Sequence, residues 1–229
     1  LFRSPAVKAV VRACAGSTFS VGADVRELGA KTMKPSSAEV MGAIDALDAL
    51  TVAAIQGQAL GGGLELSLLC DFRVSTPTAK FGLPEIKLGL IPGAAGTQRL
   101  PRLIGPEAAM AMIVSGDPVD TKKALACGLV DEIAEGGLVA AAVALANRKL
   151  AEGAPHRRLS RMPPVATDLY FTSARAKAIK DAKGLQAAGS AVDAVAASRL
   201  PFAEGVAEER RLFEDLRGST ESAALRHLF

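Results

Sequence analysis

In the first half of the chain, short apolar runs typical of strands alternate with a segment whose apolar residues have helical spacing. Residues 6–13 form a short run rich in valine and alanine, and a glycine-containing turn follows it, so we predict a strand that ends in a loop. Residues 38–50 carry apolar side chains at helical spacing, and residues 52–55 read as a buried strand. A strand, a helix and a strand in succession favour parallel pairing of the two strands.

The pattern becomes mainly helical after residue 97. Pro106 is expected at the start of a helix, Asp120 is a predicted N-cap, and Gly128 is expected to end the helix that Asp120 begins. Further predicted elements are a helix over 64–70, a strand over 72–75, an extended segment over 79–81 and an alanine-rich helix over 138–150.

We therefore predict an α/β core over residues 1–152 and a helical C-terminal region over residues 153–229. A proline-containing connection, residues 154–167, separates the two parts, and everything after it is expected to be helical.

Composition and charge narrow the class of protein. The chain has 229 residues, of which 49% are apolar, enough for a sizeable core. Its 27 basic and 24 acidic residues are interspersed and leave a net charge of +3, so no basic stripe indicates nucleic-acid binding. No apolar run approaches a membrane span and no leader opens the chain, so we expect an intracellular protein, cytoplasmic if the source is bacterial. The three cysteines form no C-x-x-C pair and lie far from both histidines, which favours reduced thiols over a metal site.

The first candidate for chemistry is Glu65, at the end of the run Gly61-Gly62-Gly63-Leu64-Glu65. The glycines follow an apolar run and open a helix, so their backbone amides should point outward from a helix N-terminus and can hold a developing negative charge. Gly62 and Glu65 are three residues apart and share a helix face. A tight turn that merely requires glycine is the alternative interpretation.

The second candidate is Glu85, which lies among apolar residues and proline-fixed turns. Partial burial there is expected to raise its pKa, which suits a general acid. Glu85 is equally well explained as a helix-start carboxylate after Pro84. Asp24 and Asp71 can likewise be simple turn or cap residues.

The third candidate is the loop over residues 19–28, at the end of the first predicted strand. Its amides are the natural second donor for an oxyanion, because one donor leaves the other lone-pair direction of a carbonyl unfilled. Arg26 is either a cation for a phosphate or a solvated surface charge.

These three segments, in this order and with this interval between Glu65 and Glu85, resemble the enoyl-CoA hydratase/isomerase (crotonase) family. The resemblance runs from residue 6 to residue 135 and includes the motifs at 114–117 and 124–131. It implies a ββα spiral core.

Residue by residue, the resemblance implies that the amides of Ala23 and Gly62 form the oxyanion hole for a thioester, and that Glu65 and Glu85 perform acid/base chemistry. The two carboxylates would hold one water, whose oxygen adds to C3 of a trans-2-enoyl-CoA while C2 receives a proton. No metal or redox cofactor is implied, since coenzyme A is part of the substrate. The substrate-binding residues implied are Val21, Asp24, Val25, Arg26, Gly61, Pro84 and Gly93.

Two carboxylates favour a hydratase of fatty-acid β-oxidation, because a Δ3-Δ2-enoyl-CoA isomerase needs only one. A dual activity stays open, and so does a non-catalytic module that binds acyl-CoA or RNA, although such a module would not need the glutamates.

Residues 200–210 and 222–229 resemble the end of the hydratase half of bifunctional hydratase/3-hydroxyacyl-CoA dehydrogenases. This resemblance implies a dehydrogenase domain beyond Phe229, and a further strand and helix before Leu1. No G-x-G-x-x-G occurs, so we expect no NAD binding by these residues. The resemblance also implies a homo-oligomer, because family members that are not fused to another domain form trimers.

Overall fold

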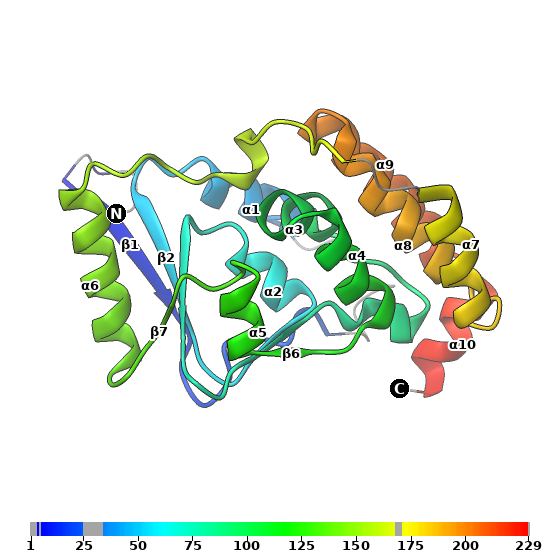
Figure 1. Ribbon diagram of the computed structural model, residues 1–229, viewed down its shortest axis with the longest axis horizontal. Coiled ribbons are helices and arrows are strands. Elements are labelled where there is room, and N and C mark those ends of the chain that lie inside the picture. The colour runs from blue at the N-terminus through cyan, green and yellow to red at the C-terminus, as the bar shows by residue number, and fades with distance from the viewer. Residues whose placement is uncertain (1–3, 5, 25–33, 168–170, 229) are drawn as a thin grey trace. The chain divides into compact units, whose positions relative to one another are not determined.

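A computed structural model describes residues 4, 6–24, 34–167 and 171–228 (Figure 1). The chain divides into two compact units, each described by itself: Leu1–Phe81 with Val119–Leu159, and Gly82–Pro118 with Ser160–Phe229. These units are discontinuous in sequence, unlike the contiguous parts predicted with a boundary at residue 152. The division at residue 152 stays a prediction.

The first unit is built on a parallel sheet in the order β1-β2-β4-β7. Its strands are β1 (Ala9–Ala13), β2 (Leu50–Ile55), β4 (Phe72–Ser75) and β7 (Glu132–Ile133). The predicted parallel pairing of the first two strands is confirmed, with Ala9 opposite Leu50. Because β2 begins at Leu50, the helix predicted over 38–50 ends earlier, as α1 (Ser37–Asp45).

Helix α6 (Leu138–Ala151) packs on one face of this sheet (Figure 1). Apolar residues of β2 and β4 meet apolar residues of α6 in one buried cluster, which contains Leu50, Val52, Ala54, Phe72, Val74, Ala134, Ala142, Leu145 and Ala146. Phe72 and Val74 point to this core, so Arg73 between them points to the opposite face of β4.

A smaller sheet has the order β3-β5-β6, formed by β3 (Gln58–Leu60), β5 (Lys80–Gly82) and β6 (Val119–Asp120). The helices α2 (Gly62–Ser67) and α5 (Thr121–Ala126) also belong to the first unit. Asp120 caps α5 as predicted, because its side chain accepts a hydrogen bond of 2.9 Å from the amide of Lys123.

The second unit is helical. It contains α3 (Gly96–Ile104), α4 (Pro106–Ser115), α7 (Phe171–Asp181), α8 (Gln186–Ala196), α9 (Phe202–Arg217), α10 (Thr220–Leu228) and the 3-10 turns η2 (Pro84–Leu88) and η4 (Ala197–Arg199). The 3-10 turn η3 (Leu159–Arg161) lies where the two units join in sequence.

Helix α8 is the central helix of this unit and contacts α3, α4, α7 and α9. Its buried face consists mostly of alanine, glycine and valine, and such small side chains let neighbouring helices approach closely. The mixed α/β fold with a helical C-terminal region agrees with the predicted fold class. Across the described residues, no helix combines the length and apolar character that crossing a membrane requires.

Candidate active site

The glycine triplet forms a turn that begins helix α2. Gly61 is the N-cap, with a φ of 53° and a ψ of −131°, a conformation that glycine adopts without strain. The helix predicted over 64–70 starts two residues earlier, at Gly62 within the glycine triplet, and ends at Ser67 instead of Cys70. Glu65 lies in its first turn, its amide donates to the Gly61 carbonyl over 3.0 Å, and only 3% of the residue is exposed.

The loop that precedes Ala23 lies directly against this turn. Ser20 pairs with Ala59 in a parallel bridge, and its carbonyl accepts a hydrogen bond of 3.0 Å from the Leu60 amide. The approach is so close that a Cβ on Gly63 would lie 2.2 Å from the Ser20 carbonyl oxygen. Glycine at position 63 is therefore required for the loop and the helix to meet.

This contact brings Ala23, Gly62 and Glu65 together. A Cβ on Gly62 would lie 3.7 Å from the amide nitrogen of Ala23 and 4.0 Å from Oε2 of Glu65. The structure shows no hydrogen bond from the amide of Ala23 or Gly62 to another described residue. Two backbone donors and one carboxylate thus border the same small space, an arrangement able to bind an oxyanion beside a proton acceptor.

Glu85 lies in the second unit, on the turn η2. Pro84 is the first residue of this turn, Glu85 is half-buried, and Gly89 ends the turn with a φ of 66°. Glu65 and Glu85 therefore belong to different units, and the division of work between them around one water stays a prediction.

The predicted substrate-binding residues fall in three groups. Val21 and Asp24 are exposed, and Gly61 is buried at the N-cap of α2. Val25 and Arg26 lie outside the described residues. In the second unit, Gly93 lies against the ring of Phe213, since a Cβ on Gly93 would meet that ring at 2.9 Å.

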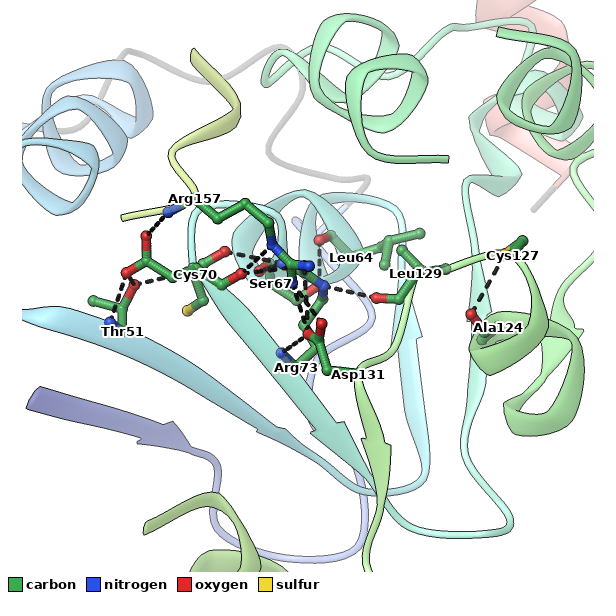
Figure 2. A network of polar contacts seen from close by, with 11 residues as sticks. Thr51, Leu64, Ser67, Cys70, Arg73, Ala124, Cys127, Leu129, Asp131 and Arg157 are labelled. Atoms are coloured by element: carbon green, nitrogen blue, oxygen red, sulfur yellow. Dashed lines mark hydrogen bonds and ion pairs between the residues drawn. The ribbon is translucent and has the colours of Figure 1, made fainter. Parts of the chain in front are cut away.

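A buried arginine that the sequence did not single out lies at the other end of α2. Nη1 of Arg73 donates to the carbonyls of Cys70, at 2.9 Å, and Ser67, at 3.3 Å, while its Nε donates to the Leu129 carbonyl at 2.7 Å (Figure 2). Arg73 has no exposed surface, and Asp131 is its nearest ionic partner, at 3.8 Å from Nη2.

Asp71 is the second centre of this polar network. Its carboxylate accepts from the amide and hydroxyl of Thr51, at 2.8 and 2.9 Å, and from the amide of Arg157 at 2.8 Å. Arg158 pairs with it at 3.0 Å, and both side chains are buried. Arg157 also donates to both carboxylate oxygens of Asp131 (Figure 2). Asp71 is thus a buried carboxylate that binds several distant segments, and not the simple turn or cap residue considered as an alternative.

Burial shifts two pKa values in this region. It lowers the pKa of Arg73 to about 10, against the opposing attraction of Asp131. It also raises the pKa of the Cys70 thiol, with nearby arginines acting in the opposite direction. The sequence signal for this network is a charged residue inside an otherwise apolar strand, the segment Phe72-Arg73-Val74.

In the second unit, a buried carboxylate holds the loop after Gly93. Glu209 of α9 accepts hydrogen bonds from the amides of Ala95, at 2.6 Å, and Thr97, at 2.9 Å, and from the Thr97 hydroxyl. These amides belong to the start of α3, so Glu209 caps that helix from a distant segment. Among the described residues, no cluster of histidine, cysteine, aspartate and glutamate has the make-up of a metal site.

Comparison with known proteins gives this geometry a family context. The chain is 39% identical over 228 residues to the peroxisomal bifunctional enzyme of Danio rerio, covering 98% of this chain and 32% of that protein. It is 38% identical to the peroxisomal bifunctional enzyme of Homo sapiens, covering 97% of this chain and 32% of that protein. The chain thus spans about a third of the length of these relatives.

Solved structures also resemble this chain. The "Enoyl-CoA Hydrates Subunit I" of Geobacillus kaustophilus HTA426 is 31% identical, with a TM-score of 0.57 over 95% of this chain and 75% of that one. OdaA of Pseudomonas aeruginosa, at 22% identity, shares the fold, with a TM-score of 0.68 over 99% of this chain and 81% of that one. The sequence profile described as "Enoyl-CoA hydratase/isomerase" matches residues 2–209. This chain therefore belongs to the enoyl-CoA hydratase/isomerase family.

Proposed function

We propose that this chain is an enoyl-CoA hydratase, which adds water across the double bond of a trans-2-enoyl-CoA to give a 3-hydroxyacyl-CoA. The observation that carries the proposal is the meeting of Ala23, Gly62 and Glu65 at the start of α2. Family membership supports it. Since the similar relatives are bifunctional and three times longer, we also propose that a covalently linked dehydrogenase domain accompanies this chain.

The backbone amides act on the carbonyl of the thioester. Addition of water to a conjugated thioester builds negative charge on the carbonyl oxygen, and the amides of Ala23 and Gly62 donate to that oxygen. Because these donors are part of the folded backbone, they need no rearrangement when the charge develops. This stabilisation requires neither a metal nor a redox cofactor.

The two glutamates move the protons. One carboxylate takes a proton from water as its oxygen bonds to C3, and the other, protonated, gives a proton to C2, so the balance is one water added. Different environments suit these opposite roles, and Glu65 is more deeply buried than Glu85. The proposed binding partner is acyl-CoA, and the proposed location is an intracellular compartment. If the chain exists without a linked domain, we propose that it forms a homo-oligomer.

The test is hydration of crotonyl-CoA by the full-length protein, followed by the loss of enoyl-thioester absorbance. Glu65→Gln and Glu85→Gln should each lower kcat by about 10²- to 10⁴-fold, the usual contribution of a general acid or base. The control is Glu107→Gln, which changes an exposed carboxylate in the first turn of α4 and should leave kcat unchanged.

Binding of butyryl-CoA, which has no double bond to hydrate, shows whether the variants keep the thioester site. An active wild type whose two glutamate variants bind butyryl-CoA and retain full activity would contradict the roles of Glu65 and Glu85. Wild-type protein that binds butyryl-CoA without hydrating crotonyl-CoA would instead support the non-catalytic alternative.

Isomerisation is a second candidate function, because the described oxyanion donors already lie beside one carboxylate, Glu65, within one unit. One carboxylate is enough to carry a proton between two carbons. With a trans-3-enoyl-CoA as substrate, a dual enzyme would form the trans-2 isomer, and this activity should depend on Gly62 and on one glutamate only.

A further inference from the structure

Helix α2 carries the proposed oxyanion donor and carboxylate at its start, and Arg73 contacts its end. The helix has six residues, Gly62 to Ser67, so about 9 Å separates its two ends. The guanidinium of Arg73 donates to the carbonyl of Ser67, the last helical residue, and to that of Cys70 just beyond it. Arg73 therefore binds α2 at the end opposite the proposed oxyanion donor Gly62.

A helix of this length is not stable by itself. Nucleation is costly, and the last carbonyls of any helix lack partners within it. A cation at this end satisfies those carbonyls and opposes the partial negative charge of the helix dipole. The planar guanidinium suits the task because its fork of donors reaches several carbonyls at once.

Arg73 is itself fixed to the sheet. It belongs to β4, its amide donates to Asp131 over 2.8 Å, and its Nε donates to the Leu129 carbonyl over 2.7 Å. The side chain thus links α2 to the segment that enters β7 (Figure 2). Since Arg73 is fully buried, water cannot replace these donors if the side chain is lost.

We propose that Arg73 is a positioning residue for the hydration reaction, because it holds α2 so that Gly62 and Glu65 keep their places beside Ala23. This role rests on the proposed function. A displacement of about 1 Å at reacting groups can cost about 10²-fold in rate, so a loosened α2 should lower kcat although Arg73 touches no substrate.

The test compares Arg73→Met and Arg73→Lys with Leu145→Ala in the full-length protein. Methionine fills part of the volume and removes all donors. Lysine keeps a cation but lacks the fork that reaches Ser67, Cys70 and Leu129 together. Leu145 lies in the apolar core on the opposite face of β4, so its truncation controls for loss of stability alone.

The readout is kcat per folded molecule, with the folded fraction measured by circular dichroism, and KM for crotonyl-CoA. Arg73→Met should lower kcat by about 10- to 100-fold with KM changed by less than about threefold, and Arg73→Lys should recover part of the loss. Leu145→Ala should keep the wild-type kcat per folded molecule.

The pH dependence of kcat distinguishes a positioning role of Arg73 from a general loss of protein stability. The titratable and charged groups facing Arg73 are Asp131, Asp71, Arg157 and Cys70, and burial has already lowered the pKa of the arginine to about 10. A lysine starts from about 10.4, so the same burial should make it lose its proton within the alkaline assay range. The kcat of Arg73→Lys should then fall as pH rises, where the wild type keeps its rate.

The experiment distinguishes failure of the positioning role from failure of the proposed function. An active wild type with Arg73 variants that keep its kcat per folded molecule and its pH profile would overturn this role and leave the proposed function intact. An inactive wild type would overturn both together. If Arg73→Met does not fold, the pH profile of Arg73→Lys decides alone, since a merely structural arginine would give no alkaline loss of kcat.

Discussion

The helix that carries Glu65 and the turn that carries Glu85 are fixed by different kinds of interaction. Buried charges surround the end of α2, where Arg73 binds its carbonyls and Asp71 joins the next strand to distant segments. Around the turn η2, two glycines let neighbouring segments approach closely: a Cβ on Gly89 would meet Ser222 at 3.0 Å, and one on Gly116 would meet Ile86 at 2.7 Å. In a buried polar network, the loss of one partner leaves the other polar groups without hydrogen bonds. A close approach at glycine depends only on the absence of a Cβ.

The largest expected effect follows from the buried pair of Asp71 and Arg158. Asp71→Asn leaves Arg158 as an uncompensated buried charge and weakens the hydrogen bonds to Thr51 and Arg157. Removing one partner of a buried pair typically costs about 3–5 kcal/mol. We expect a loss of this size in the free energy of unfolding, measured by urea denaturation.

The matched control is Asp117→Asn, which changes an ion pair with the turn that carries the other glutamate. Asp117 pairs with Lys87 of η2 at 2.8 Å, and both side chains are exposed. Exposed pairs contribute little, so the midpoint of denaturation should not change measurably. Equal losses from the two variants would show that buried charge does not distinguish the two regions.

The next effect concerns activity. Gly62→Ala would place a methyl group 3.7 Å from the Ala23 amide, in the space proposed for the oxyanion, with 3.4 Å as its nearest contact. Such contacts are tolerable, so stability should change little. The alanine keeps its own backbone N–H, but its methyl group would keep the carbonyl oxygen of the substrate away from the amide of Ala23. Losing one oxyanion donor typically costs about 2.7–4 kcal/mol, so kcat for crotonyl-CoA should fall by about 10²- to 10³-fold.

Gly63→Ala is the contrasting variant one residue away. Its Cβ would lie 2.2 Å from the Ser20 carbonyl, so the loop and the helix must separate. This variant should lose stability as well as activity. If Gly62→Ala loses stability and keeps its kcat per folded molecule, the two glycines are both structural and the oxyanion assignment is wrong.

The sequence predicted the elements whose own residues carry a clear local signal. Strand 72–75 was predicted with its observed bounds, and the glycine turn, the start of α2 and the cap at Asp120 follow from local residue chemistry. The strands β3, β6 and β7 have only two or three residues, too few for a period to show. The meeting of Ala23 with Gly62 came from the family resemblance and not from spacing.

The buried network could not be predicted from local pattern. Asp71 and Arg157 are 86 residues apart, and the hydrogen bond between them depends on the tertiary fold. Each residue alone looks like a surface charge or a turn residue. A charge within an apolar strand, as at Arg73, indicates a buried polar partner but does not identify it.

The smallest expected effect concerns the turn of Glu85. The buried Ser222 hydroxyl donates to the Leu88 carbonyl over 2.9 Å, so Ser222→Ala removes a hydrogen bond worth about 1 kcal/mol. Local opening of η2 should then be roughly fivefold more frequent, visible as faster hydrogen exchange at the Leu90 amide, which donates to Glu85. The Glu65 amide, which donates to Gly61 in the other unit, should exchange at its wild-type rate. Equal acceleration at both amides would mean that the two glutamates open together and are not held independently.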